Sequence, residues 1–260
     1  MKHRSVGIIG AMPEEINGIL ELISGKEVFI IGNREYHTGN INGVSVVAVF
    51  SKWGKVAAAI TADCLINHFD VTEIIFVGVA GAISDRLSVG DIVIAEKLVQ
   101  HDMDARPLIK QFEIPLLGIQ YFESDKDLFQ KMNVAIALFI KNIPSLHTEQ
   151  RKGLDEFKIT TPGVFTGLIG SGDRFVADNS SKAEIKKLLP DILCVEMEGA
   201  AMAQVCFLYG VPFIVVRTIS DAANDSSHVD FPLFVKDVAG LYGKEIVRSF
   251  FQIQNEHTHL

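Results

Sequence analysis

The sequence predicts an α/β fold in which helices cover both faces of a largely parallel or mixed sheet. Short apolar runs bounded by turn residues alternate along the chain with segments of helical periodicity, which is typical of strands joined by helices. Of the 260 residues, 48% are hydrophobic and only 22% are charged, a composition typical of a chain with a substantial core rather than a disordered one. Because no repeat, low-complexity segment or linker interrupts the pattern, residues 1–260 are expected to form one domain.

The individual elements follow from the local pattern. Apolar or β-branched runs too short for helices predict strands at 5–11, 35–38, 44–50, 73–79, 91–99, 163–169, 192–195 and 211–219. The dipeptide Asn42-Gly43 predicts the turn of a hairpin. Helical patterns predict helices at 13–23, 54–68, 127–141, 180–189, 198–209 and 231–251. Residues 254–260 are expected to form a disordered tail.

Charge and composition argue against several classes of function. The formal net charge is −8 and no basic stripe is present, so we expect no binding to nucleic acid or to an anionic membrane surface. No segment has the ~18 consecutive apolar residues that a membrane-spanning helix needs, and the first apolar run ends without a signal-peptide cleavage site. Cys64, Cys194 and Cys206 lack metal-type spacing and are expected to be reduced thiols of a cytoplasmic protein.

Acidic side chains follow three of the predicted strands. Glu196 and Glu198 come after 192–195, and Asp221 comes after 211–219. Glu15 follows the first strand, although it is explained equally well as an acid in the first turn of a helix. Because open α/β sheets place their chemistry at strand ends, we expect Glu15, Glu198 and Asp221 to meet at one sheet edge. Carboxylates there would supply the acid, the base and the sugar-hydroxyl acceptor that glycoside cleavage needs.

Other motifs carry weaker signals. The glycines at the end of the first strand lack the third glycine of a dinucleotide-binding turn, and no segment matches a phosphate-binding loop. His101-Asp102-Met103-Asp104 has the residue types of metal ligands but no partner elsewhere, so we expect no metal site. The small residues at 78–82 indicate either close helix–sheet packing or a floor beneath a ligand. Phe175 is either a core residue or a face on which a heterocycle stacks.

Six motifs occur together in one order. They are Gly10-Ala11-Met12-x-Glu14-Glu15, Ser51-x-x-Gly54-Lys55-Val56-Ala57, Gly78-x-Ala80-Gly81, Ser171-Gly172-Asp173-x-Phe175, Val195-Glu196-Met197-Glu198 and Val216-Arg217-x-Ile219-Ser220-Asp221. Over residues 5–105 and 163–250 the chain resembles the 5′-methylthioadenosine/S-adenosylhomocysteine nucleosidase family of the purine nucleoside phosphorylase superfamily. The resemblance implies a three-layer α/β/α sandwich around a central mixed sheet and a homodimer. It also implies hydrolysis that releases adenine from 5′-thioribose nucleosides without cofactor or metal.

The resemblance implies a role for each site residue. Asp221 would be the general acid that delivers a proton to adenine N7, and Glu15 would orient and deprotonate the attacking water. Glu198 would bind the ribose 2′- and 3′-hydroxyls. The other substrate-binding or supporting residues would be Met197 beneath the sugar, Phe175 and Val176 at adenine, Ser220 and Arg217 beside Asp221, Trp53 and Phe231 in the 5′-alkylthio pocket, and Met12, Ala80 and Gly81.

The chain departs from the family pattern at two places. Val79 stands where many members have serine, so a hydrogen bond near the attacking water is absent or replaced. Residues 106–162, interrupted by Pro107, form a variable, insertion-like region, and in the family this stretch lends residues to the partner's 5′ pocket.

Other functions stay open. A phosphate-dependent purine nucleoside phosphorylase would share the fold, although Lys55 and Arg217 are few groups with which to bind phosphate. Hydrolysis of 6-amino-6-deoxyfutalosine would share adenine and ribose but not the 5′ group. A nucleoside-binding protein without catalysis would not need all three carboxylates.

Overall fold

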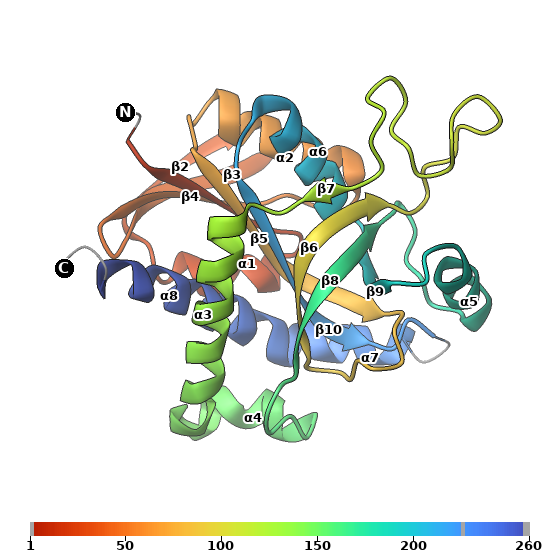
Figure 1. Cartoon of the computed structure of the whole chain (residues 1–260). Coiled ribbons are helices and arrows are strands. Elements are labelled where there is room, and N and C mark those ends of the chain that lie inside the picture. Colours follow the sequence, from red (N-terminus) through yellow and green to blue (C-terminus); the bar gives the residue numbers. More distant parts are fainter. Residues whose placement is uncertain (1–2, 225–226, 257–260) are drawn as a thin grey trace.

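The computed structural model describes residues 3–224 and 227–256 and has one central sheet with helices on both sides (Figure 1). The strands are β1 (Ser5–Gly10), β2 (Ser24–Ile31), β3 (Arg34–Ile41), β4 (Val44–Phe50), β5 (Glu73–Ala82), β6 (Ile92–Gln100), β7 (Phe122–Glu123), β8 (Val164–Ser171), β9 (Ile192–Glu196) and β10 (Phe213–Asp221). The helices are α1 (Pro13–Leu20), α2 (Lys55–Asn67), α3 (Lys126–Asn142), α4 (Thr148–Glu156), α5 (Asn179–Leu188), α6 (Gly199–Tyr209), α7 (Ser227–Phe234) and α8 (Gly240–Glu256). A 3-10 turn (Ile143–Ser145) follows α3, and a π-helical segment (Val235–Ala239) joins α7 to α8.

The sheet is mixed and closes partly on itself. Its strand order is β10-β6-β8-β9-β5-β1-β4-β3-β2, with β7 beside β6, and β10 also pairs with β5. Strands β5, β10, β6, β8 and β9 therefore form a ring from which β1, β4, β3 and β2 extend. The length of β5 makes this possible, because its first half pairs with β1 while Gly81 and Ala82 at its end pair with β9.

Alternate side chains along the strands pack into two hydrophobic cores, one on each face of the sheet. On β5, Ile74 and Phe76 join the core formed with α2 and α6, whereas Ile75 and Val77 join the core formed with α1, α3 and α8. This alternation follows from the period-two geometry of a strand. The predicted three-layer α/β/α architecture is confirmed.

The hairpin at Asn42-Gly43 is also confirmed, since both residues have positive φ (49° and 80°) and join β3 to β4 in register. Strand β2 was not predicted. Its side chains are almost all exposed, so its sequence has no alternation of buried and exposed positions. Helix α8 extends to Glu256, which is helical although it falls in the tail predicted to be disordered; residues 257–260 lie outside those described.

Most of the region 106–162 is regular structure. Helix α3 packs on α8 and buries Leu128, Met132 and Phe139 against the sheet. Helix α4 covers most of the polar stretch 151–158, for which no helix was predicted. The irregular part lies before β7, where the chain makes two projecting loops (Figure 1).

The carboxyl ends of strands from both halves of the sheet meet at one place. Strands β1, β4, β5 and β10 run in one direction, and β6, β8 and β9 are parallel to one another. Strand β9 is antiparallel to β5 but overlaps it only at Gly81–Val195 and Ala82–Cys194, so the carboxyl ends of the two groups face each other there. Side chains that follow β1, β5, β8, β9 and β10 converge on this junction.

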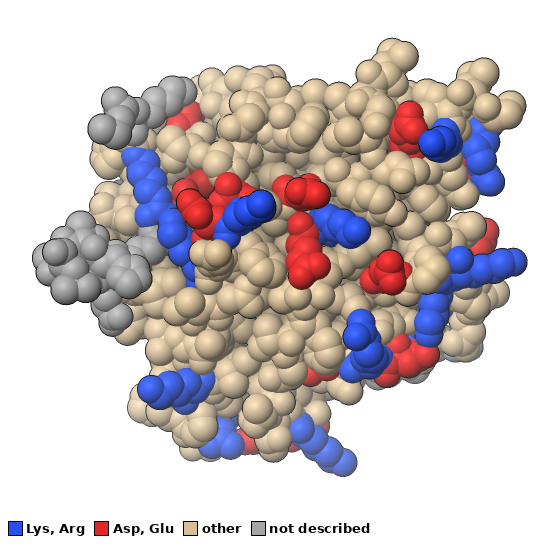
Figure 2. All heavy atoms as spheres, viewed as in Figure 1, with Lys and Arg blue, Asp and Glu red and all other residues tan. Residues whose placement is uncertain are grey.

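Acidic and basic side chains are interspersed on the face drawn in Figure 2, which shows no continuous basic surface. Within residues 3–224 and 227–256, no helix has both the length and the apolar character needed to span a bilayer.

Candidate active site

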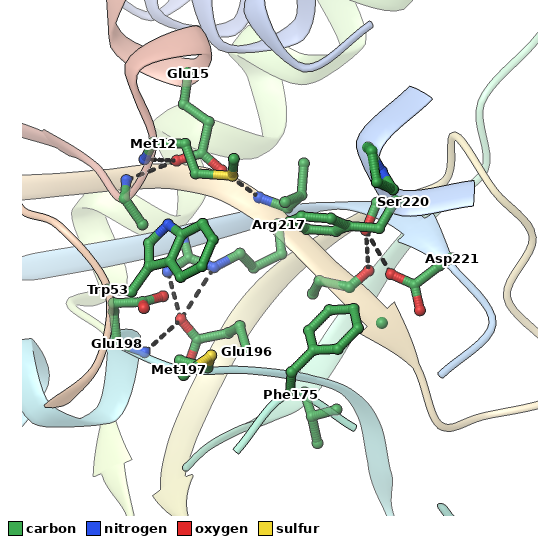
Figure 3. A pocket seen from close by; sticks show the side chains of 17 residues that line it. Met12, Glu15, Trp53, Phe175, Glu196, Met197, Glu198, Arg217, Ser220 and Asp221 are labelled. Carbon is green, nitrogen blue, oxygen red and sulfur yellow. Dashed lines mark hydrogen bonds and ion pairs between the residues drawn. The ribbon is translucent and has the colours of Figure 1, made fainter. Parts of the chain in front are cut away.

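A cavity of about 520 Å³ lies where the carboxyl ends of the strands meet (Figure 3). The sequence-predicted residues that line it are Met12, Glu15, Trp53, Ala80, Gly81, Phe175, Met197, Glu198, Arg217, Ser220, Asp221 and Phe231. Val176 lines a smaller pocket together with Phe175, Met197 and Asp221. The structure therefore brings all the candidate side chains to one region, as expected for strand ends.

Glu15 is held at the start of α1 in a way that satisfies both interpretations of its position. Its Oε2 accepts hydrogen bonds from the backbone N–H groups of Ala11 (2.6 Å) and Met12 (2.9 Å), which caps the helix. Its Oε1 accepts one from Val79 N–H (3.0 Å) in the second half of β5. Burial raises the pKa of Glu15 to about 7, against the opposing effect of Arg217. A carboxylate with a pKa near neutrality is suited to act as a general base.

Arg217 forms a buried ion pair with Glu196, contrary to the expectation that it supports Asp221. Its Nη2 and Nε donate to Glu196 Oε2 at 2.5 and 3.2 Å, and its guanidinium lies 4.2 Å from the ring centroid of Phe76. The hydrogen bonds recorded for Arg217 within the described chain go to Glu196 and to the carbonyls of Phe76 and Val216. Asp221 is held by other groups.

Glu196, which the sequence analysis names but leaves out of the site residues, lines the cavity and pairs with Arg217. Its carboxylate accepts hydrogen bonds from Ser171 Oγ and from the backbone N–H groups of Glu198 (3.2 Å) and Gly199 (2.8 Å) at the start of α6. It therefore caps α6 and neutralises Arg217 with one side chain. The available signal was Arg217 itself, because an arginine inside an apolar strand needs a buried acid as its partner.

Glu198 lies at the N-cap of α6 and faces the cavity. Its Oε1 accepts a hydrogen bond from Gly54 N–H (2.8 Å), which lies just before α2. Burial and the neighbouring charge of Glu196 raise the pKa of Glu198. The loop between β4 and α2 thus fixes Glu198, and the same loop carries Trp53 to the cavity wall.

Asp221 ends β10 and is 1% exposed. The register of β10 against β5 shifts between Ile219 and Asp221, a bulge of the kind that re-aims side chains beside active sites. Its Oδ1 accepts a hydrogen bond from Ala223 N–H (2.8 Å), and its Oδ2 lies 2.8 Å from Ser220 Oγ, which is also 3.3 Å from the carbonyl oxygen of Ala80. Since Ser220 has one hydroxyl proton, it can donate to an ionised Asp221, or accept from a protonated one while donating to Ala80. Both protonation states of Asp221 are therefore accommodated.

The rest of the cavity is largely apolar. Phe175 is 45% exposed and makes an edge contact with Phe231, with ring centroids 5.3 Å apart, so it belongs to the cavity wall rather than to the core. Trp53 is 60% exposed and lines the same cavity. Figure 3 shows Glu15 and Asp221 on different sides of the cavity, with Phe175 and Met197 along a third. A flat heterocycle with an apolar substituent fits such a lining.

The sequence 101–104, which resembles metal ligands by residue type, has a structural role in this chain. Asp102 accepts hydrogen bonds from Lys55 Nζ (2.7 Å) and Asp173 N–H (2.9 Å), which joins this loop to α2 and to the segment after β8. Within the part of the chain that the structure describes, no group of three or more His, Cys, Asp or Glu side chains is placed to hold a metal ion.

Comparisons with known proteins agree with this geometry. The family model described as "Phosphorylase superfamily" matches residues 5–252. The 5′-methylthioadenosine/S-adenosylhomocysteine nucleosidase of Geobacillus sp. (strain WCH70) is 33% identical over 245 residues, which cover 94% of this chain and 96% of the relative.

Solved structures of related enzymes superimpose over nearly the whole chain. The nucleosidase of the same name from Neisseria meningitidis, in complex with methylthio-immucillin-A, has a TM-score of 0.83 and 30% identity and covers 95% of this chain and 98% of its own. The futalosine hydrolase of Helicobacter pylori strain 26695 has a TM-score of 0.79 and 30% identity, with 96% and 98% covered. The fold and the site thus define a member of the phosphorylase superfamily. Within it, the chain belongs to the 5′-methylthioadenosine/S-adenosylhomocysteine nucleosidase family.

Proposed function

We propose that the protein hydrolyses the N-glycosidic bond of 5′-methylthioadenosine and S-adenosylhomocysteine and releases adenine. The observation that carries this proposal is the convergence of Glu15, Glu198 and Asp221, from three separate strand ends, on one largely apolar cavity. The family's nucleosidases support the choice of substrates.

The proposed reaction divides between the acid and the base. Phe175 offers a face for adenine, and Asp221 donates its proton to N7 as the bond between C1′ and N9 breaks and its electron pair passes to the base. Positive charge then develops on the ribose, as in other glycoside cleavages. Water bonds to C1′ and gives its proton to Glu15, while Glu198 holds the ribose hydroxyls. Proton exchange with solvent returns Asp221 and Glu15 to their starting states, so no cofactor is needed.

The charges around the cavity favour water over phosphate as the nucleophile. Arg217 is the only Lys or Arg among the described residues that line the cavity, and it is already paired with Glu196. A phosphate dianion near Glu15 would face like charge at a cost of ~4 kcal/mol at 4 Å for each pair of unit charges at an effective dielectric of about 20. Lys55 is paired with Asp102 instead of facing the cavity. Adenine release is therefore proposed to be independent of phosphate.

The 5′ group is proposed to be an alkylthio chain, because Trp53 and Phe231 add large apolar side chains to the cavity lining. The likeness to a futalosine hydrolase supplies the alternative substrate, 6-amino-6-deoxyfutalosine. Specificity constants for the two substrates, measured side by side, decide between them: we expect a higher kcat/KM for methylthioadenosine.

The test of the catalytic roles is adenine release by wild type, Asp221→Asn and Glu15→Gln in phosphate-free buffer. Each substitution should lower kcat at least about a hundredfold, because it removes the acid or the base. Glu14→Gln and Asp191→Asn are matched controls at exposed positions and should retain wild-type rates. A near-normal rate for either active-site variant would overturn the role given to that residue, and a requirement for phosphate would overturn hydrolysis.

The proposal includes a cytoplasmic homodimer. Val56 and Ile60 of α2 and Phe207 of α6 are exposed apolar side chains on two helices that pack together. Because Trp53 lies in the loop just before α2 and is also exposed, a second copy on this surface would cover the mouth of the cavity. Light scattering should give twice the chain mass, and Val56→Asp should reduce it to the monomer. The unpaired cysteines support a reducing compartment.

A further inference from the structure

The turn that follows β10 holds the carboxylate of Asp221 in place. Ala223 donates its backbone N–H to Asp221 Oδ1 (2.8 Å) and has a positive φ of 47°. A residue with a Cβ adopts this left-handed conformation at a cost, so the turn keeps it only where the surroundings fix it. What fixes the turn therefore also fixes the direction of the Asp221 carboxylate.

Helix α5 supplies that support from outside the cavity. Lys182 Nζ donates a hydrogen bond to the carbonyl oxygen of Ala222 (2.8 Å), the residue between Asp221 and Ala223. Ala223 is fully buried in a small apolar cluster with Val176 and Leu189, against which Ile185 of α5 packs. The turn is thus held by one charged hydrogen bond on its polar side and by apolar packing on the other.

The contact of Lys182 distinguishes it from the other lysines of α5. Lys186 pairs with Asp85 (2.5 Å) in an ion pair whose side chains are 44% and 75% exposed, and Lys187 is exposed. Lys182 is half-buried and reaches a backbone carbonyl 40 residues away in sequence. Such a hydrogen bond from a charged donor is stronger than one between neutral groups.

We propose that Lys182 is a positioning residue for the general acid: its ammonium group holds the turn at Ala222 so that Asp221 points at the leaving base. The inference rests on the proposed function. Without the ammonium group, the carbonyl of Ala222 loses its charged donor and the turn can relax from the left-handed conformation of Ala223. The Asp221 carboxylate then loses the N–H that orients it. Since proton transfer depends on near-contact geometry, this slows the protonation of adenine without removing any group from the cavity.

The test compares two substrates that differ in their need for an acid. One is 5′-methylthioadenosine, whose adenine departs with a proton. The other is 4-nitrophenyl 5-methylthioriboside, whose 4-nitrophenolate departs without one. The variants are Lys182→Met, which keeps the apolar stem, Lys182→Arg, which restores a charged donor, and the control Lys186→Met. Asp221→Asn calibrates the assay, because it should lose adenine release and keep nitrophenolate release.

Lys182→Met should lower kcat for methylthioadenosine about tenfold or more, with KM changed less than about threefold. The same variant should release nitrophenolate at a rate within about twofold of wild type. Lys182→Arg should recover most of the lost rate, and Lys186→Met should match wild type. Unchanged adenine release by Lys182→Met would overturn the inference, as would equal losses with both substrates, which indicate a general disturbance of the cavity. If Lys182→Met melts below the assay temperature, Lys182→Gln replaces it and is judged by the same ratio of the two rates. Failure of the wild type to release adenine would overturn the proposed function itself, and the inference with it.

Discussion

Raising the pH through neutrality should activate Glu15 and at the same time lower the stability of the fold. Burial raises the pKa of Glu15 from 4.5 to about 7 in the folded protein. At about 1.4 kcal/mol for each pH unit, ionised Glu15 costs the folded state about 3 kcal/mol relative to the unfolded chain. The same burial that makes Glu15 a base near neutral pH therefore lowers the free energy of unfolding.

The direction of the effect follows from the two pKa values. Because the folded pKa lies above the unfolded one, the stabilising contribution of protonated Glu15 is fully present below pH 4.5 and is lost as the pH rises through about 7. Glu15→Gln cannot titrate. Between pH 4.5 and 8, the free energy of unfolding of wild type should fall by about 3 kcal/mol relative to that of Glu15→Gln, measured by urea denaturation. Other titrating groups largely cancel in this difference.

Activity should follow the ionised fraction of the same group. Below pH 7, kcat/KM for methylthioadenosine should fall about tenfold per pH unit. The pH dependence of kcat/KM is the appropriate measurement, because it reports the pKa values of essential groups in the free enzyme. The exposed neighbour Glu14 provides the control, since Glu14→Gln should leave both the rate profile and the stability difference unchanged. An acid limb centred near pH 4.5, or a stability difference that does not vary with pH, would refute the reasoning about Glu15.

Two further predictions concern Glu196 at the end of β9 and Glu198 just after it. Glu198→Gln should lower kcat/KM for methylthioadenosine about a hundredfold. Removal of the 2′-hydroxyl from the substrate should lower kcat/KM of this variant much less than that of wild type, because the contact with the hydroxyl is already weakened. Equal losses for the two proteins in steady-state assays would contradict ribose binding by Glu198. Glu196→Gln should lower the free energy of unfolding by about 3 kcal/mol or more in urea titrations, since it leaves the buried guanidinium of Arg217 without its counter-charge. A loss below about 1 kcal/mol would contradict the proposal that Glu196 neutralises Arg217.

The sequence predicted the elements whose pattern reflects burial on one or two faces. The strands around Ile74 and Val216 are buried on both faces, so their sequences are continuous apolar runs. The Asn42-Gly43 turn could be predicted because Asn and Gly favour the positive φ angles that a tight hairpin turn needs. Strand β2 (Ser24–Ile31) has neither property, because it is an exposed edge strand that, among the described residues, pairs with β3 alone. Local sequence cannot show that pairing.

The grouping of the acidic side chains was predicted from residue type and strand position, but the hydrogen bonds and ion pairs among the cavity residues were not. Glu15, Glu198 and Asp221 each follow a strand, and the sheet brings their ends together. Arg217 within an apolar strand indicates a buried acidic partner, but which acid it pairs with depends on how β10 and β9 lie around the ring. The hydrogen bond from Lys182 to Ala222 likewise depends on where α5 packs.

The most direct test of hydrolysis is the fate of the water oxygen during turnover. The enzyme is incubated with 5′-methylthioadenosine in phosphate-free buffer made with H₂¹⁸O, and the sugar product is analysed by mass spectrometry before its anomeric oxygen exchanges with solvent. Hydrolysis should give stoichiometric adenine and ¹⁸O at C1 of 5-methylthioribose. Absence of adenine until phosphate is added, with a ribose 1-phosphate as product, would contradict it.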